Sequence, residues 1–160
     1  MTLEENKKVL IITDMEHDME SIIHQKTGIP PHYMHTIQSY GTIISHPFGD
    51  IMRSVIIAIY QESIEDICVV GVEDNHTLDN VPDDITFREG EIQTLNYLFE
   101  HCKPELIDST FEEWLKGKEK VSKNVERSID MIRRHPLVPS YVNVRGLLIN
   151  KGEEHKVVEV

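Results

Sequence analysis

The stretch Val9-Leu10-Ile11-Ile12-Thr13 decides the fold class, because it is an apolar, β-branched run without polar alternation. Such a run is typical of a strand that is buried on both faces, as in the interior of a parallel sheet. A second run of this kind, ICVVG at residues 67–71, lies further along the chain, and helical patterns separate the two. The order strand, helix, strand, helix, strand predicts an α/β fold with a central, mostly parallel sheet flanked by helices.

Apolar spacing and helix-stop residues place the remaining elements. Met19, Ile22 and Ile23 recur at helical spacing, and the helix they form should end at Gly28. Asp50 is the expected N-cap of the next helix. The other predicted elements are strands at residues 36–37 and 142–149, helices at residues 50–60, 92–102 and 111–134, a loop at residues 77–87 and a turn at residues 151–152.

Composition describes an ordinary globular protein with an acidic surface. The 160 residues are 39% hydrophobic and 28% charged, which predicts a single domain over residues 1–160. The 16 basic and 28 acidic side chains give a net charge of −12, which disfavours nucleic-acid and membrane partners. Two cysteines, Cys68 and Cys102, cannot form a disulfide framework, and no signal-peptide pattern opens the chain, so we expect a cytoplasmic protein.

Polar clusters follow the two central strands, where an open parallel sheet binds ligands. The first cluster contains Asp14, Glu16 and Asp18, and the second contains Asp74, Asn75 and His76. Acidic residues and asparagine also suit turns for purely conformational reasons, so a plain turn remains the alternative for any one of them. Two clusters at equivalent strand ends favour a site.

Six segments, in order along the chain, match one family, the second of them loosely. They are Thr13-Asp14-Met15-Glu16-His17-Asp18-Met19, His35-Thr36-Ile37-Gln38-Ser39-Tyr40-Gly41-Thr42, Asp50-Ile51-Met52-Arg53-Ser54-Val55, Val69-Val70-Gly71-Val72-Glu73-Asp74-Asn75-His76, Ile132-Arg133-Arg134-His135-Pro136-Leu137-Val138-Pro139 and Val144-Arg145-Gly146. Read in this register, residues 7–160 resemble the β-class carbonic anhydrases, above all their small bacterial branch. The resemblance implies their α/β fold and a homodimer whose active sites lie near the subunit interface.

The resemblance also locates the family's zinc site in this sequence. Its members hold zinc with two cysteines and a histidine, and these positions are occupied here by Asp14, Val72 and Asn75. An Asp–Arg pair of the family is replaced by Glu16 and Asp18. Valine has no donor atom and an asparagine amide is a poor zinc ligand, so we expect neither zinc nor hydration of carbon dioxide. The candidate pocket consists of Asp14, Glu16, Asp18, Gln38, Gly41, Asp74, Asn75 and His76.

Two function classes therefore remain open. One is a binding or regulatory protein that reuses the old cleft or dimer surface for a small-molecule ligand that the sequence does not identify. The other is an enzyme with altered chemistry that uses the acidic cluster, with or without a divalent cation such as Mg²⁺ or Mn²⁺, which oxygen ligands suit. A retained carbonic anhydrase activity is the reading that the sequence favours least.

Overall fold

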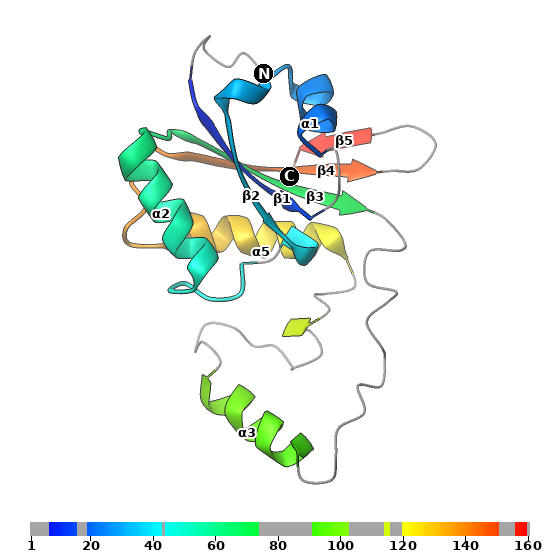
Figure 1. Ribbon diagram of the computed structural model, residues 1–160, viewed down its shortest axis with the longest axis vertical. Coiled ribbons are helices and arrows are strands. Elements are labelled where there is room, and N and C mark those ends of the chain that lie inside the picture. Colours follow the sequence, from blue (N-terminus) through cyan, green and yellow to red (C-terminus); the bar gives the residue numbers. More distant parts are fainter. Residues whose placement is uncertain are drawn as a thin grey trace.

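A five-stranded sheet in the order β2-β1-β3-β4-β5 forms the centre of the protein (Figure 1). The computed structural model describes residues 7–15, 19–42, 44–73, 91–102, 114–115 and 120–150, and the backbone of residues 156–159. The parallel strands are β1 (Val9–Asp14), β2 (Met34–Ser39), β3 (Asp66–Glu73) and β4 (Asn143–Asn150). Only β5 (Lys156–Glu159) among these described strands is antiparallel, which confirms the predicted mostly parallel sheet.

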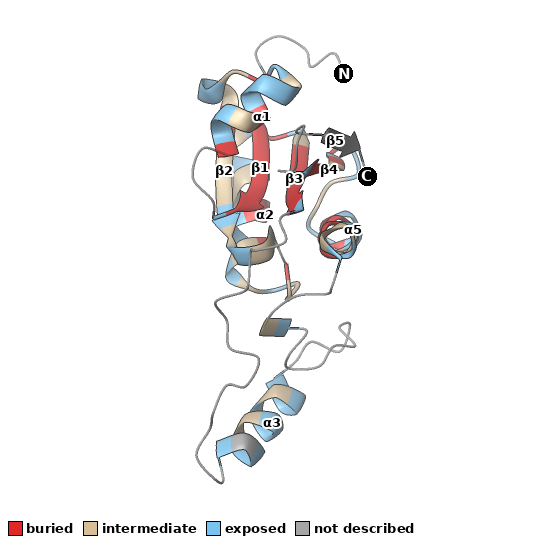
Figure 2. Cartoon of the chain, turned by 90° about the vertical axis from the view of Figure 1, so that its right-hand side faces the viewer, coloured by how far each residue is buried: buried red, intermediate tan, exposed pale blue. Residues whose placement is uncertain are grey.

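Helices cover both faces of the sheet, as the continuous apolar strands require. One face packs against α1 (Met19–Thr27), and the other packs against α2 (Asp50–Glu62) and α5 (Val121–Arg134). Figure 2 shows the buried segments of β1 and β3 between these helical layers. All six residues of β1 are buried, because each side chain along the strand faces one helical layer or the other.

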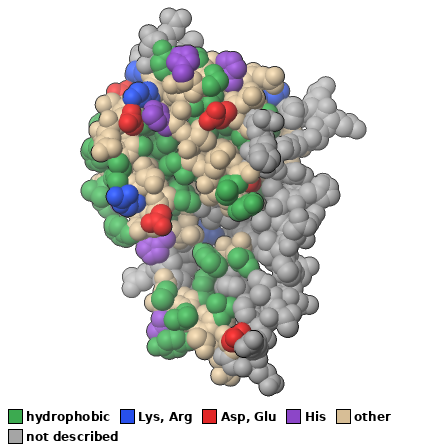
Figure 3. Space-filling view, viewed as in Figure 1, with side chains coloured by type: hydrophobic (Ala, Val, Ile, Leu, Met, Phe, Trp, Pro, Cys, Tyr) green, Lys and Arg blue, Asp and Glu red, His purple; other side chains and the backbone are tan. Residues whose placement is uncertain are grey.

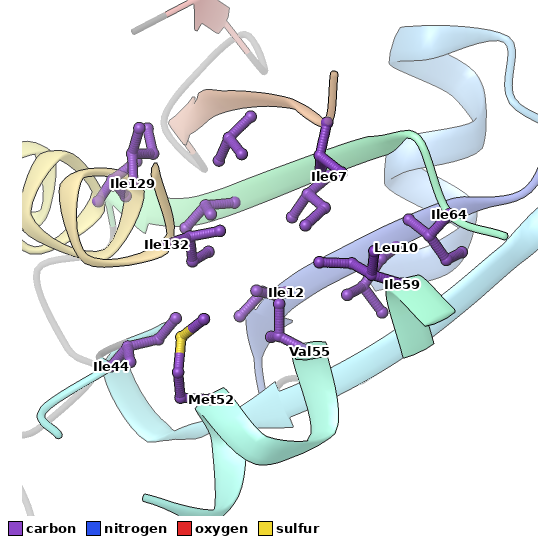
Figure 4. Packing of buried hydrophobic residues seen from close by; sticks show 14 of the residues in the cluster. Leu10, Ile12, Ile44, Met52, Val55, Ile59, Ile64, Ile67, Ile129 and Ile132 are labelled. Atoms are coloured by element: carbon purple, nitrogen blue, oxygen red, sulfur yellow. The ribbon is translucent and has the colours of Figure 1, made fainter. Parts of the chain in front are cut away.

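Strand alternation divides the buried side chains into two clusters. Leu10 and Ile12 of β1 point toward α2 and α5, whereas Val9 and Ile11 point toward α1. In Figure 4 the larger cluster fills the space between the sheet and its two helices. The labelled side chains of that cluster are Leu10, Ile12, Ile44, Met52, Val55, Ile59, Ile64, Ile67, Ile129 and Ile132.

A glycine in β3 sets how closely α5 approaches the sheet. A Cβ atom on Gly71 would lie 2.5 Å from Val125 Cγ2 and 2.7 Å from Val121 Cγ1, both on α5. Heavy atoms do not pack this closely, so any larger residue at this position would push the helix away. The absence of a side chain at Gly71 therefore lets the first turns of α5 lie directly on β3.

Several predicted boundaries were wrong by small amounts. Asp50 is not the N-cap of α2, since Gly49 holds that position with extended backbone and Asp50 lies in the first turn, where its charge suits the helix dipole. The predicted helix of residues 111–134 is interrupted at Lys120, whose backbone is extended (φ −102°, ψ 122°). The sequence also missed β5, whereas the predicted loop at residues 77–87 and turn at residues 151–152 lie outside the described residues.

The helix α3 (Glu91–Cys102) lies apart from the sheet and its helices in both ribbon views (Figures 1 and 2). Two of its apolar side chains are exposed, Tyr97 at 62% and Leu98 at 51%. Phe99 meets Trp114 at a ring-centroid distance of 6.3 Å. Within the described part of the chain, no helix combines the length and apolarity needed to span a bilayer.

The packing of α5 on Gly71 leads to a stability prediction. Gly71→Ala should lower the free energy of unfolding by about 1–3 kcal/mol, the usual cost of overpacking a filled core. Chemical denaturation of both proteins measures the loss. The double variant Gly71→Ala with Val125→Ala should lose less than the sum of the two single changes, because the shortened Val125 side chain makes room for the new methyl group. Additive losses would contradict the proposed close contact.

Candidate functional site

The candidate site begins with Asp14, a buried carboxylate at the carboxyl end of β1. The sequence had suggested that Asp14 lies in the turn after the strand. Asp14 is instead the last residue of β1, and it is 3% exposed. Its register partner on β2 is Ser39, whose buried Oγ has no hydrogen-bond partner in the described structure. A buried carboxylate beside a buried hydroxyl is therefore the polar feature at this end of the sheet.

The parallel register separates the predicted pocket residues onto two faces of the sheet. Gln38 pairs with Thr13, so it lies on the face opposite Asp14, and its side chain is exposed. Val72 lies within β3, which extends two residues beyond the predicted end, and its side chain is 2% exposed in the cluster that packs against α1. Neither residue joins Asp14 on the face of the sheet that packs against α2 and α5.

A short turn closes the site beside Asp14. The 3-10 helix η2 (Tyr40–Thr42) follows β2 and packs against β1, β3 and α5. Gly41, at its centre, has φ 75° and ψ 6°, a left-handed conformation in which a side chain is disfavoured. Gly41 therefore contributes backbone geometry to this edge of the sheet, and its place in a pocket stays a prediction.

Sequence reasoning missed two polar side chains that α5 buries in this region. Asn124 is 7% exposed and Ser128 is fully buried, although both lie on the helix face that packs into the core. Ser128 Oγ accepts a hydrogen bond of 3.1 Å from the backbone N–H of Ile44, two residues after η2. The signal was present in the sequence, since Asn124 and Ser128 fall among the apolar residues of the helical stripe that was used to predict α5.

The remaining predicted site residues lie outside the described residues. They are Glu16, Asp18, Asp74, Asn75 and His76. Within the described ranges, no group of three histidine, cysteine or acidic side chains is arranged to hold a metal ion. The structure therefore places Asp14, Val72, Gln38 and Gly41, and it leaves the convergence of the two acidic clusters as a prediction.

The opposite, amino end of the sheet carries acids that are already paired. Lys8 Nζ donates a 2.6 Å hydrogen bond to Glu62, and this contact, with the charge of Lys8, holds the pKa of the Glu62 carboxyl below its usual range. Lys7 lies 2.9 Å from Glu65 in the same way. These exposed pairs contribute little to stability, but they balance charge at the end of the sheet away from Asp14.

Comparison with known proteins identifies the family. No protein-family model matches the chain. The Bacillus subtilis protein YbcF, which has a provisional name as a carbonic anhydrase-like protein, is 51% identical over 162 residues, covering 100% of this chain and 91% of YbcF. The chain belongs to the β-class carbonic anhydrase-like family. The Trichomonas vaginalis β-carbonic anhydrase isoform I shares the fold, with a TM-score of 0.66, 22% identity and coverage of 99% of this chain and 86% of that enzyme.

A second solved structure with the same fold is the apo form of a carbon disulfide hydrolase. It matches with a TM-score of 0.63 and 20% identity, covering 96% of this chain and 78% of the hydrolase. The names of these two structural neighbours thus describe two different reactions on one fold. Fold membership alone does not identify the reaction, which depends on the residues of the site.

One of the two described residues at the positions that the resemblance assigns to zinc ligands cannot bind zinc. Val72, which the resemblance aligns with the histidine ligand, has a side chain made only of carbon and hydrogen, and it packs among apolar residues such as Ile149 and Val70. Asp14, at a cysteine position, offers carboxylate oxygens instead of a thiolate. A zinc ion held by this family uses sulfur and imidazole donors, and neither described position supplies one.

The contact between Ser128 and Ile44 leads to a prediction about the wall of the site. Ser128→Ala should destabilise the protein by about 1–3 kcal/mol, because it leaves the buried Ile44 N–H without this acceptor. Thermal or chemical unfolding measures the change. Ser54→Ala is the matched control, since Ser54 Oγ bonds to Asp50 O on an exposed helix surface and its loss should cost less than about 0.5 kcal/mol. Equal losses in both variants would contradict a structural role for Ser128.

Proposed function

We propose that this protein is a binding or regulatory member of the carbonic anhydrase-like family that does not hydrate carbon dioxide. The single observation that carries the proposal is Val72, a buried valine at the position that the resemblance assigns to a zinc-ligating histidine. Without a metal, water at neutral pH is a poor nucleophile, since its pKa stays near ~15.7 instead of the ~7 that bound zinc gives it. The scaffold would then serve to position a ligand rather than to activate water.

A second candidate function is an enzyme with altered chemistry. The burial of Asp14 beside the unpartnered hydroxyl of Ser39 favours it, because a desolvated carboxylate next to a hydroxyl can act on a substrate proton. In this reading Glu16, Asp18 and Asp74 would add oxygen ligands for Mg²⁺ or Mn²⁺. A stoichiometric divalent cation in the purified protein would favour this second candidate over the first.

The first functional prediction concerns metal content and hydration. Purified protein should contain substoichiometric zinc by elemental analysis, and stopped-flow assays should show no hydration of carbon dioxide above the uncatalysed rate. Stoichiometric zinc together with saturable hydration would overturn the proposal. Stoichiometric Mg²⁺ or Mn²⁺ in the same analysis would favour the enzyme with altered chemistry.

Restoring the family's zinc-ligating residues tests the same proposal by a gain of metal binding. The triple variant Asp14→Cys, Val72→His, Asn75→Cys supplies the two thiolates and the imidazole of the family's zinc site. Because Val72 lies on the face of the sheet opposite Asp14, zinc binding by this variant requires the end of β3 to turn so that the new imidazole reaches the side of Asp14. The control is the double variant Asp14→Cys, Asn75→Cys, which keeps Val72 and should bind zinc more weakly. If both variants bind zinc equally well, Val72 does not occupy a ligand position.

We further propose that the protein is a homodimer. The described edge strand β2 has no strand beyond it, and such an edge favours pairing or coverage by another chain. In Figure 3 hydrophobic side chains reach the surface along the edge formed by α2, and the acidic and basic side chains of this face are dispersed. Exposed apolar side chains on α3 add surface that a second subunit could cover.

The dimer can be tested by light scattering coupled to size exclusion at micromolar concentration. The mass should be that of two chains, and Leu98→Glu should weaken the dimer about tenfold or more, since it places a charge on an apolar contact surface. Gln93→Glu, on an exposed position of the same helix, is the matched control and should leave the mass unchanged. A monomeric mass for the unmodified protein would contradict the proposal.

A further inference from the structure

Two turns with the same His-Pro-apolar sequence meet between α2 and α5. The first is His46-Pro47-Phe48, just before α2, and the second is His135-Pro136-Leu137, just after α5. In the first turn the backbone N–H of Phe48 donates to His46 Nδ1 at 2.9 Å. In the second, the backbone N–H of Leu137 donates to His135 Nδ1 at 3.2 Å. Each histidine therefore accepts a hydrogen bond from the residue two positions after it.

A third hydrogen bond joins the two turns. His135 Nε2 lies 2.9 Å from the carbonyl oxygen of Pro47, which can only accept, so Nε2 carries the proton. Phe48 packs edge-on against the His135 ring at a centroid distance of 5.4 Å. His135 itself is 5% exposed. Its two bonds together require the neutral imidazole with the proton on Nε2.

Two other histidines in the chain have the opposite arrangement. His24 Nδ1 lies 2.7 Å from the carbonyl oxygen of Ile29, and His101 Nδ1 lies 2.7 Å from that of Tyr97. A carbonyl accepts, so Nδ1 donates in both cases. A second proton on either ring leaves these bonds intact, whereas a proton on Nδ1 of His46 or His135 would face an N–H group that is itself a donor.

Among the described residues, neither His46 nor His135 forms an ion pair with an acidic side chain within 4.0 Å. The ionisable groups of the two helices that adjoin the turns are Asp50, Arg53 and Tyr60 in α2, and Arg133 and Arg134 in α5. Tyr60 donates to Leu137 O, Arg133 donates to Val144 O, and Arg134 pairs with Asp130.

We propose that the paired turns form a proton-sensitive latch that holds residues 44–49 against the end of α5 in neutral solution and releases them in acid. Protonation of Nδ1 removes the bonds from Phe48 and Leu137 N–H and replaces them with donor–donor contacts. The latch therefore rests on the geometry of these bonds, in which each Nδ1 must be unprotonated to accept from a backbone N–H.

The latch bears on the candidate site through its position in the chain. The segment it holds starts at Ile44, two residues after the end of η2, and the N–H of Ile44 donates to Ser128 Oγ. η2 packs against β1 and β3 at the carboxyl end of the sheet. Release of residues 44–49 would therefore loosen one wall of the region around Asp14, whichever ligand that region binds.

The test combines the protonation site of each histidine with the protection of individual amides. Nitrogen-15 NMR at pH 8 should show the proton on Nε2 of His46 and His135 and on Nδ1 of His24 and His101. Between pH 8 and pH 5.5 the hydrogen-exchange protection factors of the Phe48 and Leu137 amides should fall about five- to tenfold, the factor of one ordinary hydrogen bond. The amide of Gly28, bonded to His24 O at 2.8 Å, should stay protected.

A matched pair of substitutions isolates the titration. His46→Asn keeps an acceptor for Phe48 N–H, as asparagine does in turns, but cannot be protonated, so Phe48 should keep its protection at pH 5.5. His24→Asn keeps a donor for Ile29 O and should leave the pH dependence at Phe48 and Leu137 unchanged. A proton on Nδ1 of His135 at pH 8, or the same acid loss at Phe48 in His46→Asn as in the unmodified protein, would overturn the latch.

Discussion

The close approach of α5 to β3 over Gly71 is the constraint on which the rest of the structure depends. Because no side chain separates them, Val121 and Val125 lie directly on the strand, and the following turn of α5 brings Ser128 to Ile44 N–H. That bond holds the chain that leaves η2, and η2 packs against the carboxyl ends of β1 and β3. At the other end of α5, His135 Nε2 forms a hydrogen bond with the carbonyl oxygen of Pro47. The absence of a side chain at Gly71 thus lets a single helix, α5, hold the chain at both Ile44 and Pro47.

The order and direction of the strands could be predicted because they follow from local patterns. Runs such as residues 9–13 and 67–71 are apolar without alternation, and only burial on both faces of the sheet removes all of their side chains from water. The ends of the strands were less predictable. Asp14 and Glu73 continue the sheet through backbone pairing, although their polar side chains do not indicate a strand. The antiparallel β5 was missed for the same reason: its place depends on pairing with β4 rather than on its own four residues.

Sheet topology predicts where a site should lie, but it does not predict which side chains face that place. Parallel topology put it at the carboxyl ends of β1 and β3, where Asp14 lies. Register, which the sequence does not reveal, then put Gln38 on the far face and Ser39 beside Asp14. Asn124 and Ser128 belong to a helix distant in the sequence, so no local motif linked them to this end of the sheet. Tertiary packing, rather than spacing along the chain, selects such residues.

Strand pairing and apolar packing hold the described residues at the positions that the resemblance assigns to zinc ligands. A bound zinc ion would link the ends of β1 and β3, and metal ligands often contribute part of the folding free energy. Here the two strands pair directly along residues 9–12 and 66–69, and Val72 adds to the apolar cluster under α1. A buried valine stabilises this cluster by about 1.5–3 kcal/mol relative to an exposed one, whereas a histidine there would need a polar partner. Packing at Val72 therefore stabilises the protein at a position where the family's zinc-binding members carry a metal ligand.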